Sequence, residues 1–98
     1  EENVLRILTM IARQVRLIML AKELNAQHLS RADKATRLGI SSGFPLKKTL
    51  EQERRFSFEQ LKEVHHQLLK TDLSIKTGAL EETIALELLV VHLCSTKL

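Results

Sequence analysis

Apolar residues recur at intervals of three and four positions along almost the whole chain, the spacing that gathers side chains on one face of an α-helix. No long run alternates between apolar and polar positions, as a half-buried β-strand would. Short polar segments containing glycine or proline interrupt the helical pattern. The sequence therefore predicts an all-α fold, a five-helix orthogonal bundle, with helices over residues 3–25, 31–38, 45–54, 58–77 and 81–96.

Residues with strong positional preferences mark where these helices begin and end. Ser57 followed by Gln60 has the spacing of a capping box, in which each side chain bonds the backbone amide of the other residue. Pro45 suits the first turn of a helix, where its missing N–H costs no intrahelical bond. Gly39 and Gly78 stand where two of the helices are expected to stop.

The first and last predicted helices carry more apolar surface than a small bundle can bury. Over residues 3–25 the polar side chains form one stripe, and between residues 88 and 95 the one markedly polar side chain is His92. A chain of 98 residues has room for a single core, so part of this surface should contact another chain. The positions expected at such an interface are Leu5, Leu8, Ile11, Val15, Ile18, Leu86, Leu89, Val90 and Leu93.

The net charge of +3 is unevenly distributed, because residues 31–55 hold seven basic side chains and only three acidic ones. Such an excess fits either a solvated helical face or a contact with phosphate. Residues 35–42 also resemble the turn of a helix-turn-helix, with a small residue before the turn and glycine at it. A helix-turn-helix DNA-binding domain is therefore the alternative hypothesis, with Lys47, Lys48, Arg54 and Arg55 as its DNA contacts.

No set of residues with the spacing of a catalytic or cofactor site is present. The three glycines are scattered and form no phosphate-binding loop, so no nucleotide cofactor is expected. His65 and His66 are adjacent and would point about 100° apart on a helix, whereas metal ligands on one face stand three or four residues apart. The sequence therefore predicts a domain without catalytic activity, metal or cofactor.

Asp72 falls on the apolar face of its predicted helix, where a charge needs a partner. Lys76 lies one turn later, and Arg54 or Arg55 could reach it from the end of the preceding helix. Cys94 is the single cysteine, which excludes an internal disulfide and fits a small buried residue in a reducing compartment. Charged residues interrupt the apolar run over residues 5–24, so no transmembrane helix is expected.

An ordered set of short motifs resembles the C-terminal domain of the bacterial DNA polymerase III delta protein. These motifs are Ile-Ala-Arg-Gln-Val-Arg-Leu at residues 11–17, Leu-Gly-Ile at 38–40, Phe44 followed by two lysines, Arg-Arg-Phe-Ser at 54–57, Asp-Leu-Ser-Ile-Lys-Thr-Gly at 72–78 and Leu-Glu-Leu-Leu-Val at 86–90. The proline follows Phe44 here, whereas the family usually places it before the aromatic residue. The positions that carry the resemblance are Leu38, Gly39, Phe44, Arg55, Phe56, Asp72, Lys76 and Gly78.

The resemblance implies that residues 1–98 are the C-terminal collar domain, an oligomerisation domain, of a longer clamp-loader subunit in the bacterial cytoplasm. In this family the C-terminal domains of five subunits pack side by side, and separate N-terminal domains act on the sliding clamp. The implied partners are the delta-prime and gamma or tau subunits, with the clamp and primed DNA reached only through the full-length complex. The delta subunit lacks ATPase and polymerase activity. Its apolar helices would also allow a homodimer when the natural partners are missing.

Overall fold

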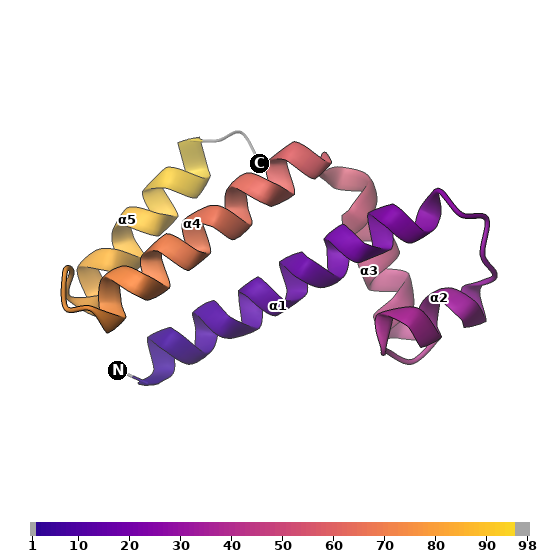
Figure 1. Ribbon diagram of the computed structural model, residues 1–98, viewed down its shortest axis with the longest axis horizontal. Helices are drawn as coiled ribbons and strands as arrows, with labels where there is room; N and C mark the ends of the chain where they lie inside the picture. Colours follow the sequence, from indigo (N-terminus) through magenta and orange to yellow (C-terminus); the bar gives the residue numbers. More distant parts are fainter. Residues whose placement is uncertain (1, 96–98) are drawn as a thin grey trace.

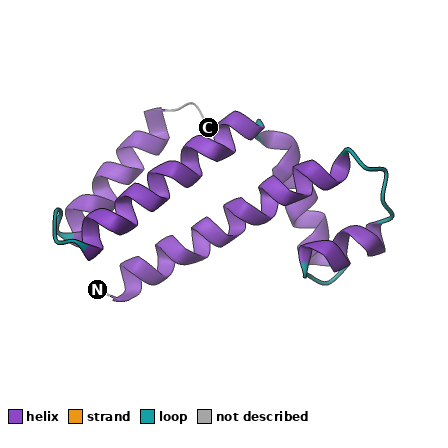
Figure 2. Ribbon diagram, in the orientation of Figure 1, coloured by secondary structure: helices purple, strands orange, loops and turns teal. Residues whose placement is uncertain are grey.

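The structure, a computed structural model, describes residues 2–95, and every regular element in that range is a helix (Figures 1 and 2). The predicted all-α, five-helix bundle is confirmed, and the helix ends fall within about one residue of the expected positions. Residue 96, the predicted end of the last helix, lies outside the described residues. The helices are α1 Glu2–Asn25, α2 Arg31–Leu38, α3 Phe44–Arg55, α4 Phe58–Lys76 and α5 Glu82–Ser95.

Helix α1 takes part in both halves of the molecule. It has 24 residues, which at a rise of about 1.5 Å per residue makes it about 36 Å long. Figure 1 shows α4 running beside α1 with α5 packed on α4, while α2 and α3 gather at the C-terminal end of α1. The interior is accordingly divided into two apolar clusters, one on each part of α1.

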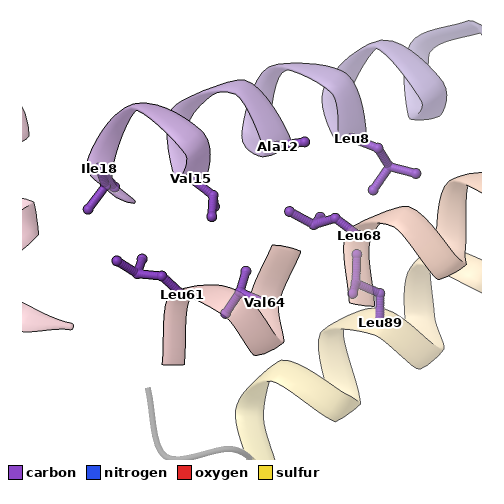
Figure 3. Packing of buried hydrophobic residues seen from close by; sticks show 8 residues of the cluster. All are labelled: Leu8, Ala12, Val15, Ile18, Leu61, Val64, Leu68 and Leu89. Atoms are coloured by element: carbon purple, nitrogen blue, oxygen red, sulfur yellow. The ribbon is translucent and has the colours of Figure 1, made fainter. Parts of the chain in front are cut away.

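The first cluster joins α1, α4 and α5 (Figure 3). Leu8 of α1 and Leu68 of α4 each retain only 1% of their accessible surface, and Leu89 brings α5 onto the same cluster. Removing a leucine side chain from water stabilises the folded chain by about 1.5–3 kcal/mol. The other buried members are Ala12, Val15, Ile18, Leu61 and Val64.

The second cluster holds the short helices α2 and α3 against the end of α1. Leu46 of α3 is completely buried, and Leu50 follows one turn later on the same face. Helix α2 contributes Ala35 and Leu38. The next residue, Gly39, ends α2 with a φ of 73°, a left-handed conformation that glycine adopts without steric cost. The remaining buried members are Ala21 and Leu24 of α1.

The local capping chemistry expected from the sequence is confirmed. The Ser57 hydroxyl accepts from the Gln60 amide at 3.0 Å, and the Gln60 side chain accepts from the Ser57 amide at 2.8 Å. At the other end of α4, Gly78 has a φ of 76°, and the Leu80 amide donates back to the Ser74 carbonyl at 3.1 Å. None of the described helices combines the length and the apolar character needed to cross a bilayer.

Helix α5 is capped by a carboxylate that precedes it. The amides of Thr83 and Ile84 donate to the Glu81 carboxylate over 3.1 and 3.2 Å, and these bonds hold the pKa of Glu81 below its usual value of 4.5. Because the pKa is lower in the folded than in the unfolded chain, the carboxylate stabilises the fold above about pH 4.5. That stabilisation is lost as the pH falls through the folded-state value.

We therefore expect Glu81→Gln to lower the thermal unfolding temperature slightly at about pH 6 and by less at about pH 3, because the contribution of the wild-type carboxylate declines as the pH falls below about 4.5. The measurement is a set of melting curves followed by circular dichroism. Glu87→Gln, further along the exposed side of the same helix, serves as the control. An equal loss for Glu81→Gln at both pH values would contradict the capping role.

Candidate interaction surfaces

Helix α5 exposes a row of large apolar side chains. Ile84, Leu88 and Val91 follow helical spacing and are each about half or more exposed, and Val90 beside them is 52% exposed. Leu88 and Val91 also line a groove of about 410 Å³ between α4 and α5. We call these four residues the α5 face. A protruding apolar row beside a groove is typical of a surface that packs against another protein.

Helix α1 has a second such surface on its N-terminal half. Ile7, Met10 and Ile11 are exposed at helical spacing, and we call them the α1 face. Gln14 extends this row toward α3, where its side-chain amide donates to Gln52 at 2.7 Å. The α1 face therefore continues the side of α1 that α3 covers further along the helix. Met10 borders a groove of about 320 Å³ that reaches the end of α2.

The expected interface residues divide between the surface and the core. Leu8, Val15, Ile18 and Leu89 are buried in the first cluster, so the prediction that they face a partner is wrong for these four. They point toward the neighbouring helices of the same chain, as Figure 3 shows. Ile11 and Val90 are exposed and Leu5, Leu86 and Leu93 are half-buried, so their place at an interface stays a prediction.

Sequence reasoning missed five of the seven residues that form the two faces, namely Ile7, Met10, Ile84, Leu88 and Val91. The α5 face could not be located because α5 is apolar almost all round, so its pattern does not indicate which side turns inward. On α1 the polar stripe identified one exposed side correctly, but Ile7 and Met10 lie outside that stripe and are exposed as well. The missing information was where α3 packs: it covers only the C-terminal part of α1 and leaves the N-terminal part uncovered on that side.

A buried carboxylate joins three helices and was also missed. Glu53 of α3 is only 6% exposed; its Oε1 lies 3.0 Å from the Lys22 ammonium of α1, and its Oε2 accepts from the Asn25 side-chain amide. Lys34 of α2 donates in turn to Asn25 Oδ1 at 2.8 Å. The signal was present, since Glu53 stands seven residues after the buried Leu46 and therefore on the same face of α3.

Of the two partners predicted for Asp72, Lys76 or an arginine of α3, the structure confirms Lys76. The Lys76 ammonium lies 2.9 Å from an Asp72 carboxylate oxygen. Arg54 and Arg55 do not pair with Asp72. They lie at the end of α3, next to the start of α4, and Asp72 is about 21 Å further along α4. A contribution of Arg55 to this pair is therefore ruled out. Cys94, expected to be buried, is exposed near the end of α5.

Two of the four histidines contact a side chain of another helix. His92 of α5 lies 3.3 Å from the Glu63 carboxylate of α4, and His65 lies 3.4 Å from an Arg16 nitrogen. Hydrogen bonds from Gln67 and from His92 lower the pKa of the Glu63 carboxyl. Within residues 2–95, no group of three or more histidine, cysteine, aspartate or glutamate side chains is arranged to hold a metal ion.

The predicted DNA contacts all lie on the solvent-facing side of α3. Lys47, Lys48 and Arg54 are exposed, as is Arg55. Phe44, at the start of the same helix, is 72% exposed, the highest value of any large apolar side chain in the described residues. This side of α3 is thus chemically distinct from the α1 and α5 faces, because it combines cations with one aromatic ring.

Three comparisons with known proteins agree. The family model described as DNA polymerase III delta subunit, C-terminal domain, matches residues 1–93. The Bacillus subtilis (strain 168) protein DNA polymerase III subunit delta is 32% identical over 92 residues, which are 94% of this chain and 26% of that protein. The solved structure of the Bacillus subtilis DNA clamp loader delta protein matches with a TM-score of 0.83 and 31% identity, over 92% of this chain and 26% of that one. The chain therefore spans about a quarter of the length of these relatives.

Proposed function

Because this chain belongs to the family formed by the C-terminal domain of the DNA polymerase III delta subunit, we propose that it is the non-catalytic assembly domain of a bacterial clamp loader. The observation that supports this proposal is the pair of exposed apolar faces on α1 and α5, each next to a groove. Large apolar side chains left in water on a small monomer are costly and mark a surface that packs against another protein.

The proposed partners are the other clamp-loader subunits, delta-prime and gamma or tau. The domain would supply binding surface only, while contacts with the sliding clamp and primed DNA would require the full-length complex. This role implies a cytoplasmic location in a bacterium. Should the chain be produced without its partners, the same faces provide a route to homodimers.

We expect Leu88→Asp with Val91→Asp to weaken assembly of the full-length subunit with delta-prime and gamma by at least about ten-fold, because two charges would be buried in an apolar contact. Ile7→Asp with Met10→Asp should have a similar effect through the α1 face. Both pairs are exposed in the free domain, so the fold should be retained. The measurement is sedimentation of the reconstituted complex, with circular dichroism melting of each variant.

The control is Leu73→Asp, the same chemical change at a leucine of α4 that is 61% exposed but lies outside both faces. Assembly should be close to wild type for this variant. If all variants assemble normally, or if Leu73→Asp is as damaging as the others, the two faces are not the assembly surface. The comparisons do not favour the helix-turn-helix alternative, because they match a clamp-loader protein.

A further inference from the structure

We propose that a groove between α1 and α4 binds an acidic peptide, with one aliphatic side chain of the peptide inside the groove and carboxylates of the peptide on the cations around it. The groove has a volume of about 120 Å³, and we call it the α1–α4 groove. It lies on the side of α1 opposite the α1 face, because Arg16 of the groove stands nine residues, or two and a half turns, after Ile7. The inference does not depend on the proposed assembly role.

The floor of the α1–α4 groove is apolar and belongs to the first cluster. Leu8 and Ala12 of α1 and Leu68 of α4 form this floor, and Figure 3 shows Leu8 and Leu68 facing each other between the two helices. Leu69, which also lines the groove, is 51% exposed. A cavity of about 150 Å³ holds a benzene molecule, so a groove of 120 Å³ has room for one aliphatic side chain.

Cations stand at both ends of the α1–α4 groove. Arg16 of α1 lines one end, where His65 of α4 lies 3.4 Å from an Arg16 nitrogen, and Lys76 lines the other end. Lys62 adds a third cation, because Lys62, Leu69 and Lys76 are spaced by seven residues and so form one row along α4. An apolar pocket flanked by cations is complementary to a ligand that carries an apolar group between negative charges.

The one acid that lines the α1–α4 groove leaves most of this positive charge uncompensated. The Asp72 carboxylate is paired with the Lys76 ammonium at 2.9 Å. Among the side chains that the structure describes, no carboxylate oxygen lies within 4.0 Å of Arg16 or Lys62. A wholly apolar partner would cover Arg16 without a compensating charge, whereas a peptide with carboxylates supplies that charge.

A peptide fits the α1–α4 groove better than a nucleic acid does, although both can be polyanions. Within residues 2–95, no aromatic ring lines the groove, so an unpaired base would have no ring to stack on. A nucleic-acid strand also has no aliphatic side chain for the apolar floor. Lys62 and Lys76 are about 21 Å apart along α4, a distance that an extended peptide covers in about seven residues. A short acidic peptide can therefore reach the cations at both ends.

The test is fluorescence anisotropy of the 98-residue chain with a labelled peptide of about nine residues, consisting of aspartates around one central leucine. Replacing that leucine by serine in the peptide should weaken binding at least about ten-fold, because the apolar side chain no longer fills the groove. Arg16→Gln with Lys62→Gln in the protein should weaken binding about five-fold, and Arg16→Lys alone should retain most of the affinity.

A charge-matched control separates the α1–α4 groove from the overall positive charge. Arg37→Gln with Lys70→Gln removes one arginine and one lysine from exposed positions elsewhere and should leave most of the affinity. Melting curves confirm that each variant is folded.

Four results would overturn the proposal. They are a wild-type chain that does not bind the leucine peptide at low salt, equal binding of the leucine and serine peptides, and equal losses for the two double variants. The fourth is an oligothymidine of the same net charge that loses as much affinity as the peptide in Arg16→Gln with Lys62→Gln, because the groove would then be a nucleic-acid site.

Discussion

Lys22→Met should lower the free energy of unfolding by about 3 kcal/mol, because it leaves the Glu53 carboxylate buried without a compensating charge. Methionine keeps most of the length of the lysine side chain, so packing against α3 is largely preserved. Glu53 would retain its bond from Asn25, but a single amide donor does not replace an ammonium ion that lies 3.0 Å away.

Urea unfolding of the single and double variants measures this effect. Lys22→Met with Glu53→Gln should recover much of the loss, because the buried side chain is then neutral and can still accept from Asn25. Lys70→Met, at an exposed position of α4, should change stability by less than about 0.5 kcal/mol. A Lys22→Met variant as stable as this control would show that the ion pair does not hold α1 and α3 together.

Leu68→Ala should cost about 2–5 kcal/mol, because the side chain is 1% exposed and lies where α1, α4 and α5 meet (Figure 3). For a domain of this size such a loss is a large part of the total stability. Leu69→Ala is the matched control, since the same change is made one residue later at a side chain that is 51% exposed.

The control should lose less than about 1 kcal/mol, because little apolar surface is removed from the interior. Thermal melting followed by circular dichroism distinguishes the two variants. Equal unfolding temperatures for Leu68→Ala and Leu69→Ala would mean that the α1, α4 and α5 cluster is not the main source of stability.

The helices could be predicted from the sequence because their ends are fixed by local interactions. The capping box at Ser57 and the glycines at 39 and 78 act within a few residues, so no knowledge of the tertiary fold is needed to read them. The salt bridge between Asp72 and Lys76 was predictable for the same reason, since its partners stand one turn apart.

The candidate site depended on packing between distant segments and was predicted only in part. Leu8 and Leu89 were expected at an interface because apolar residues on α1 and α5 look alike in sequence, whether they face a partner or the core. Glu53 was counted among the charges of a basic segment, whereas its burial and its pairing with Lys22 depend on a contact across 31 residues. Such choices are made by the tertiary fold and leave only weak periodic signals.

The sharing of α1 between two apolar clusters also has a consequence for how the chain folds as it is synthesised. The cluster around Leu46 and Leu50 needs only the first 50 residues or so, whereas the cluster around Leu8 must wait for Leu89 to emerge. The loop that the second cluster closes is the shorter one, so its entropic cost is lower. The C-terminal end of α1 therefore gains its partners on the growing chain first, and its N-terminal half lacks its full set of partners until α5 has been synthesised.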